Sequence, residues 1–197
     1  MTRGGFAELC GKSCFSLLEG ASQPDEVIEK AKELNLSAIA IADRGGLYGS
    51  VRAHLAAKKI AQPYIVGAEL PCEDDAGSVV LLVRDLKGYE NLCRLVTKAH
   101  EGRPREIALL ALDDLASYAK GLVALAKSSD ERLLSVLRDA FADCAYLATW
   151  RHYAGDDDVR ERGMRHASRR FGLPMIATAM PLYHEPSRKP IADVLQC

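Results

Sequence analysis

The chain has 197 residues, of which 48% are hydrophobic and 27% charged, and its formal net charge is -1. This length allows one domain with a substantial core, and the composition excludes a disordered or fibrous chain. The near-zero charge excludes a global attraction to nucleic acid, so any DNA contact would need a local patch or a covalently attached neighbour.

The cysteines indicate a cytosolic protein. Most lie in apolar stretches and none forms a CxxC pair, which is typical of reduced compartments; they are Cys10, Cys14, Cys72, Cys93, Cys144 and Cys197. The N-terminus lacks the apolar run of a signal peptide, and no stretch approaches the roughly 20 apolar residues of a membrane span. We therefore expect a cytoplasmic protein without membrane partners.

Short apolar runs alternate with helix-length amphipathic segments along most of the chain. This alternation predicts repeated β-α units around a mainly parallel sheet. Within each run the residues are apolar throughout and do not alternate with polar ones. This is expected when helices cover one face of the sheet and packed side chains fill the other. The predicted strands lie near 6–9, 38–41, 64–66, 79–83, 122–125, 146–149 and 175–177.

The first predicted helix has a clear start signal. Ser22 is a candidate N-cap, followed by Pro24 in the first turn and by Asp25 three residues after the cap. Its predicted buried stripe is Val27, Ile28, Ala31 and Leu34.

A later helix is predicted near 156–171. Its apolar stripe is expected to be Val159, Gly163, Ala167 and Phe171. Another side carries Arg162, Arg165 and Arg169. Such a stripe could touch DNA phosphates, but a charged stripe is usually the solvated face of a helix, and that interpretation is favoured here.

The C-terminal part is predicted to contain a loop over 181–190 and a last helix from Ile191. We expect one domain over 1–197. The chain stops at Cys197 inside the helical pattern, which fits either a truncated fragment or a short natural protein.

Several segments, in this order, resemble the PHP (polymerase and histidinol phosphatase) domain of the bacterial DNA polymerase III alpha subunit, and its error-prone class most. They are FAEL (6–9), SCFSLLEGAS (13–22), AIAIAD (38–43), LYG (47–49), IVGAEL (65–70), GYENLCRL (88–95), WRH (150–152), GLP (172–174) and DVL (193–195). The resemblance implies a distorted (β/α)7 barrel, with mainly parallel strands, helices outside, and the site at the carboxyl ends of the strands.

Active members of this family hold zinc, manganese or iron ions there and hydrolyse phosphoesters, which requires imidazole and carboxylate ligands. The family's His-x-His is Cys10-Gly11-Lys12 in this chain, its Thr-Asp-His is Ala42-Asp43-Arg44, and the aspartate of its Leu-Asp-Gly-Ala is Glu19. Its last motif, Asn-Asp-Val-His-Tyr-His, is 179–184 here, where His184 matches the non-ligating histidine. The former ligand positions are Cys10, Lys12, Glu19, Asp43, Arg44, Glu69, His152, Met180 and Leu182.

Two interpretations of these positions remain open. A single zinc could be bound by Cys10, Asp43, Glu69 and His152. We favour the absence of a metal and of catalytic residues, because Lys12 and Arg44 would oppose a cation electrostatically. The remaining histidines, His54, His100 and His166, fall on predicted helices or their ends, without ligand-like partners.

Without metals, the remaining carboxylates would repel one another unless they are paired. We therefore predict that the cations Lys12 and Arg44 pair with the remaining carboxylates Glu19, Asp43 and Glu69, and that Met180 and Leu182 fill space with apolar volume.

The resemblance implies a non-catalytic structural or interaction domain of a DNA-directed DNA polymerase, in replication or translesion synthesis. Its partners would be the polymerase domains or other replication proteins, with DNA contacted indirectly. One alternative is a metal-dependent phosphoesterase or 3'-5' proofreading exonuclease with a reduced ligand set, using zinc or manganese. Another is a free-standing barrel of other function, because fold does not fix function.

Overall fold

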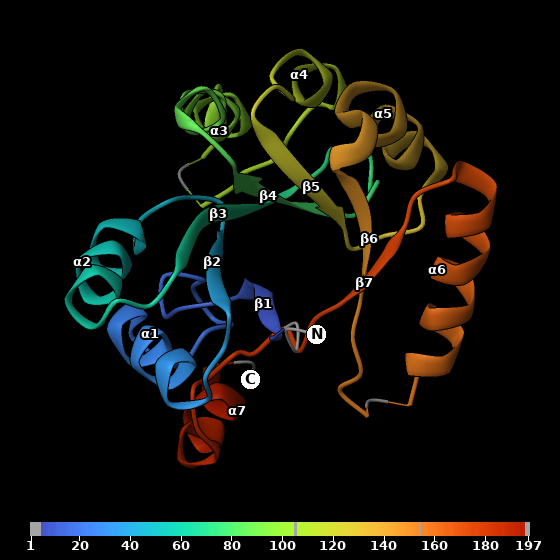
Figure 1. Cartoon of the computed structure of the whole chain (residues 1–197). Helices are drawn as coiled ribbons and strands as arrows, with labels where there is room; N and C mark the ends of the chain where they lie inside the picture. Colours follow the sequence, from blue (N-terminus) through green and yellow to red (C-terminus); the bar gives the residue numbers. More distant parts are fainter. Residues whose placement is uncertain (1–4, 105, 154, 196–197) are drawn as a thin grey trace. The chain divides into compact units, whose positions relative to one another are not determined.

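The computed structural model describes residues 5–104, 106–153 and 155–195. Its seven strands are neighbours in sequence order, β1-β2-β3-β4-β5-β6-β7 (Figure 1). All seven predicted strands are confirmed. The chain divides into two compact units, one made of Met1–Ala68 and Ala179–Cys197 and the other of Glu69–Thr178. The single domain over 1–197 stays a prediction.

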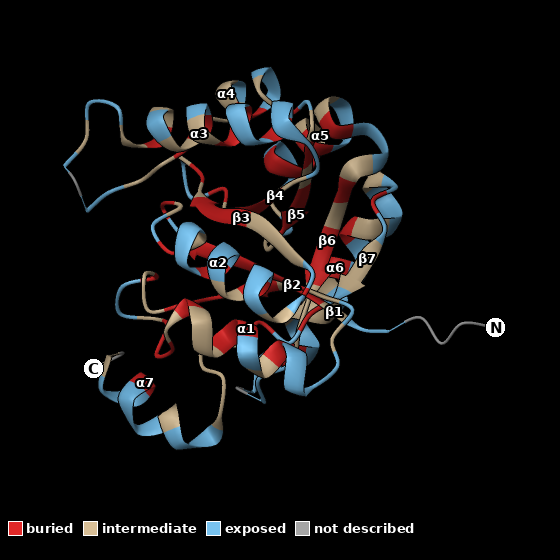
Figure 2. Ribbon diagram, turned by 60° about the vertical axis from the view of Figure 1, so that its left-hand side comes forward, coloured by how far each residue is buried: buried red, intermediate tan, exposed pale blue. Residues whose placement is uncertain are grey.

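The first unit packs two helices beside two parallel strands. Its elements are β1 (Ala7–Gly11), α1 (Pro24–Glu33), β2 (Ala38–Arg44), α2 (Ser50–Ile60), the start of β3 (Tyr64–Pro71), the 3-10 helix η2 (Pro186–Arg188) and α7 (Lys189–Leu195). Strands β1 and β2 pair in parallel. The core of this unit is Val27, Ile28, Ala31, Ile39, Ile41, Ala53 and Ala57, while the outer faces of α1 and α2 are exposed (Figure 2).

The start of α1 differs by one residue from the prediction. The N-cap is Gln23, whose backbone amide donates to Glu26 Oε2 at 2.8 Å. Ser22 is not available as a cap, because its hydroxyl accepts the backbone amide of His184 at 2.8 Å. The predicted stripe is buried except for Leu34, which is 58% exposed at the C-cap.

The second unit contains the rest of β3 and most of the helices. Its elements are β4 (Ser78–Val83), α3 (Leu86–His100), α4 (Leu112–Ser117), β5 (Leu122–Ala126), α5 (Glu131–Phe141), η1 (Ala142–Cys144), β6 (Ala145–Thr149), α6 (Asp157–Phe171) and β7 (Met175–Ala177). Pairs β5-β6 and β6-β7 are parallel, but β4-β5 is antiparallel. Strand β4 breaks the β-α alternation because only the short turn 72–77 separates it from β3.

The predicted apolar stripe of α6 is confirmed only in part, because Ala167 is buried and Gly163 and Phe171 are partly buried. Val159 is 64% exposed, and the buried apolar side chains of the helix are Met164 and Ala167. A strict four-residue spacing advances by about 40° per step on a helix with 3.6 residues per turn. Four such residues therefore drift around the helix and cannot all face the core.

The chain ends in short helical elements. The predicted loop over 181–190 contains η2, and the last helix begins at Lys189, two residues before the predicted start. In the described part of the chain, no helix has the length and apolar character that crossing a bilayer requires.

Candidate functional site

Cations and carboxylates meet at the carboxyl ends of β1 and β2. Lys12 follows β1 directly and Arg44 is the last residue of β2, while Glu19 lies in the loop between β1 and α1. Lys12 Nζ contacts Glu19 Oε2, and a guanidinium nitrogen of Arg44 lies 3.1 Å from Glu19 Oε1. The side chain of Lys12 is only 3% exposed, whereas that of Arg44 is 50% exposed. Glu19 thus has one buried and one solvated cationic partner.

Asp43 is satisfied in another way. This buried carboxylate accepts hydrogen bonds from the Ser13 amide, the Ser13 hydroxyl and the Ser16 hydroxyl, each at 2.7 Å. The prediction that a cation pairs with Asp43 is therefore wrong, because neutral donors from the loop after β1 reach it instead.

The segment that follows β7 is attached to β1 and its loop. Pro181 O accepts the amide of Lys12 at 3.3 Å, and Leu182 O accepts the amide of Ala21 at 2.8 Å. The side chain of Met180 is buried, and that of Leu182 is partly buried. His184 Nδ1 lies 2.8 Å from the hydroxyl of Ser22, so this histidine serves the loop-to-helix junction.

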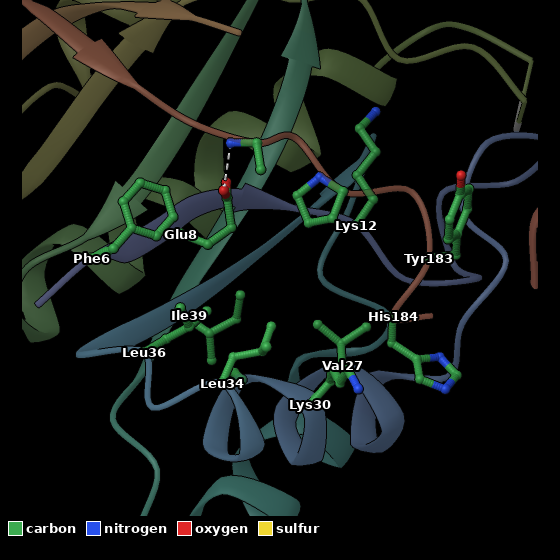
Figure 3. Close-up of a pocket in the computed structure, with 13 residues that line it drawn as sticks. Phe6, Glu8, Lys12, Val27, Lys30, Leu34, Leu36, Ile39, Tyr183 and His184 are labelled. Carbon is green, nitrogen blue, oxygen red and sulfur yellow. Dashed lines mark hydrogen bonds between the residues drawn. The ribbon is translucent and has the colours of Figure 1, made fainter. Parts of the chain in front are cut away.

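Glu8 is a buried residue of β1 that the sequence did not single out. Its Oε1 accepts the amide of Cys10 at 2.8 Å. Its Oε2 accepts the amide of Ala179 at 2.7 Å, the hydrogen bond drawn as a dashed line in Figure 3. Glu8 thus fixes both the strand end that carries Cys10, itself buried, and the start of the C-terminal segment.

A largely apolar cavity of about 440 Å³ lies beside this carboxylate. Val27 of α1 and its C-cap residue Leu34 line one side, and Glu8 of β1 and the preceding Phe6 line another (Figure 3). Of the former ligand positions, Lys12 alone is among the residues that line it. The cavity therefore shares only Lys12 with the former ligand positions.

In the second unit, Glu69 is balanced by a cation that the sequence reasoning missed. Lys127 Nζ lies 2.8 and 2.7 Å from the two carboxylate oxygens of Glu69, and the hydroxyl of Ser78 donates at 2.9 Å. The side chain of Glu69 is 2% exposed and that of Lys127 is 14% exposed. Lys127 directly follows β5, as Lys12 directly follows β1. A cation immediately after a strand was the signal that could have identified it.

Lys127 also lies over the ring of the single tryptophan. Its Nζ is 5.9 Å from the centre of Trp150, and the guanidinium carbon of Arg160 is 4.4 Å from it. Two cations on one indole ring are held by its negative face. Arg160 also pairs with Asp157, so the ring of Trp150 connects the Glu69–Lys127 pair to the start of α6.

His152 is exposed, and its backbone amide donates to Asp157 at 3.3 Å. Burial raises the pKa of Asp157, but hydrogen bonds from Arg160 and from the amides of His152 and Tyr153 outweigh it and leave that pKa below its ordinary value. The motif WRH therefore joins β6 to α6 through backbone contacts.

The donor chemistry does not suit a metal cluster. Within the described residues, no three His, Cys, Asp or Glu side chains are grouped so that they could hold a metal ion. Glu19 and Glu69 each have an ammonium partner, and Asp43 is saturated by short hydrogen bonds. A metal would have to displace these partners, so the residues present do not fit the group that the family uses.

Comparisons with known proteins identify the family and the fold. The family model described as "PHP domain" matches residues 9–160. An error-prone DNA polymerase of Anaeromyxobacter dehalogenans is 43% identical over 98% of this chain, and one of Bdellovibrio bacteriovorus is 33% identical over 98%. The chain spans 18% and 19% of the length of these relatives. A solved structure described as a putative metal-dependent phosphoesterase from Bifidobacterium adolescentis matches with a TM-score of 0.63 and 15% identity, covering 92% of this chain and 88% of that one. At this identity the match shows the fold, a distorted (β/α)7 barrel of PHP type.

Proposed function

Because this chain belongs to the PHP domain family, we propose that it is a non-catalytic structural or interaction module of an error-prone type of DNA polymerase. The observation that carries the proposal is the pairing of former ligand carboxylates with lysines: Glu19 with Lys12, and Glu69 with Lys127. In an active member those carboxylates would bind cations that activate water. An ammonium group balances the same charge but cannot activate a water molecule.

The partners follow from the length of the relatives. Because the chain matches about a fifth of the length of error-prone DNA polymerases, we infer that its partners are polymerase domains or other replication proteins. Catalysis of polymerisation would belong to those other domains. The setting is cytoplasmic, with no membrane partner.

The test is to measure metal content and phosphoesterase activity on the same preparation. Elemental analysis should find zinc, manganese and iron well below one ion per chain. Hydrolysis of a generic phosphoester should not rise when manganese or zinc is added, because lysines occupy the carboxylates that would bind the metal.

Near-unit zinc or manganese, with turnover that Glu69→Ala abolishes and Glu90→Ala leaves intact, would overturn the proposal in favour of a phosphoesterase with a reduced ligand set. Glu90 is the matched control, since it is an exposed carboxylate in a surface pair with Lys87.

A further inference from the structure

Helix α6 has an unusual division between its buried and exposed residues. Only Met164 and Ala167 among its apolar side chains are buried, whereas α5, which packs beside it, buries Leu133, Leu134, Leu137 and Phe141. A helix that is polar around most of its circumference often serves contacts beyond its own core. Packing against the core therefore does not explain why the exposed surface of α6 is so rich in charged side chains.

The C-terminal part of α6 carries only positive charge. Residues 162–171 contain no Asp or Glu, and their cationic side chains Arg162, Arg165, Arg169 and Arg170, together with His166, are all exposed. Two of these arginines are engaged: Arg165 pairs with Glu161, and Arg170 with Glu131 of α5. Among the described residues, Arg162 and Arg169 have no ion pair or side-chain hydrogen bond.

The two unengaged guanidinium groups share one side of the helix. Positions seven apart lie about two turns from each other, which is about 10 Å along the axis. His166 lies between them at the i+4 position from Arg162. One DNA strand carries a phosphate about every 3.4 Å of helix rise, so this row spans about three nucleotides.

We propose that Arg162, His166 and Arg169 form a docking surface for the phosphate backbone of DNA. The planar guanidinium group binds phosphate oxygens through two parallel hydrogen bonds. Asp158, the carboxylate four residues before Arg162 on the same side of the helix, pairs with Arg151. The chain as a whole has a net charge of -1, so the attraction is local and orients α6 toward the DNA. The choice of DNA as the polyanion rests on the proposed function. The observation that this surface is positively charged does not depend on that function.

The experiment measures binding of the whole 197-residue chain to a fluorescein-labelled DNA duplex by anisotropy, at salt concentrations from about 50 to 200 mM. The native chain should bind weakly, with a Kd of about 10⁻⁴ to 10⁻⁶ M, and should bind unrelated sequences equally. The double variant R162E/R169E should lose about tenfold or more in affinity. Its salt dependence, the slope of log K against log salt, should fall by about 2 because two phosphate contacts are removed.

The matched control is K58E/K59E on α2, which makes the same change of net charge at two exposed cations outside α6. It should retain the native affinity, and both variants should keep the native circular dichroism spectrum. The milder variant R162Q/R169Q should weaken binding in the same direction, so the result does not depend on charge reversal.

Three outcomes would overturn this inference: no DNA binding by the native chain at about 50 mM salt, equal loss in K58E/K59E, or displacement of the DNA by polyglutamate at equal charge concentration. The last would assign the surface to an acidic protein. None of these outcomes depends on metal content or phosphoesterase activity, so failure here is distinguishable from failure of the proposed function.

Discussion

The charged residues of this chain differ in how much their removal should cost in stability, because some are buried and others are exposed. Glu69 and Lys127 are both largely removed from solvent, whereas Arg44 is half exposed while it pairs with Glu19. Breaking a buried pair leaves one charge desolvated without compensation, but an exposed charge regains water. The consequences of removing each cation should therefore follow burial and not the number of contacts.

Lys127→Met should lower the free energy of unfolding by about 3 to 5 kcal/mol, because it leaves the buried Glu69 carboxylate without its ammonium partner. Urea denaturation measures this change. Lys87→Met is the matched control, since its pair with Glu90 is half exposed and should contribute about 0 to 1 kcal/mol. The double variant Glu69→Gln/Lys127→Met should recover much of the loss. Equal costs for Lys127→Met and Lys87→Met would contradict the prediction.

Lys12→Met should cost more stability than Arg44→Ala, although both cations contact Glu19. The side chain of Lys12 is 3% exposed, so its loss should cost about 1 to 3 kcal/mol. The cost stays in this range because Glu19 is 28% exposed and keeps its pair with Arg44. Arg44→Ala should cost about 0 to 1 kcal/mol. This cost should shrink further at high salt, because salt screens the exposed pair of Arg44 with Glu19. Denaturation curves of both variants at low and high salt test the order. A larger cost for Arg44→Ala would show that the guanidinium group, and not the buried ammonium, balances Glu19.

Residue patterns predicted part of this site. Lys12 and Arg44 stand out because each replaces a histidine of a recognisable motif, so their positions at strand ends followed from the sequence. The motif comparison could not predict the serine partners of Asp43, and although the position of Lys127 directly after β5 marked it as a candidate, its pairing with Glu69 could not be predicted. Their contacts depend on the path of the loop after β1 and on the register of β4 with β5, which no local pattern fixes.

At the scale of elements, local signals predicted strands better than helix faces. Each strand is a short apolar run buried by its neighbours, so its existence does not depend on a rotational phase. The buried face of α6 does depend on a rotational phase, and the four-residue spacing included the exposed Val159 and missed the buried Met164. The start of α1 also shifted to Gln23, because a distant residue, His184, uses the hydroxyl of Ser22.

Asp130 provides a test of helix capping in α5. Its carboxylate accepts the backbone amides of Arg132 at 3.0 Å and Leu133 at 3.2 Å. Asp130→Ala should lower the free energy of unfolding by about 1 kcal/mol at neutral pH. Asp139→Ala, which removes an exposed carboxylate near the other end of the same helix, should change stability by less than about 0.5 kcal/mol.

The effect of Asp130 should depend on pH in one direction. The hydrogen bond from the Arg132 side chain, with the amides of Leu133 and Arg132, outweighs partial burial and holds the pKa of Asp130 below its ordinary value of 3.8. A lowered pKa in the folded state stabilises the fold above the unfolded value, and this contribution is lost as the pH falls through the folded value. The difference between the native chain and Asp130→Ala should therefore be constant at neutral pH and shrink below pH 3.8. A difference that grows in acid would contradict the assignment.

For the whole molecule, the question is whether folding depends on a metal ion. In proteins whose carboxylates and imidazoles converge on metals, binding free energy contributes to folding, and chelators destabilise them. Here lysines balance Glu19 and Glu69, so the stabilising charges are covalently part of the chain. We therefore predict that the stability of this chain does not depend on metal supply.

The thermal midpoint of unfolding should therefore be the same with a chelator and with added zinc or manganese. A metal that binds only the folded state stabilises it by about 2.7 kcal/mol at one hundred times its Kd, which would raise the midpoint of a chain of this size by about 5 to 10 °C. Differential scanning calorimetry resolves such a shift. A rise with manganese that Glu69→Gln removes and Glu90→Gln retains would contradict the prediction, because it would place a working metal site at Glu69. A rise that both variants retain would come from surface binding and would leave the lysine-balanced site intact.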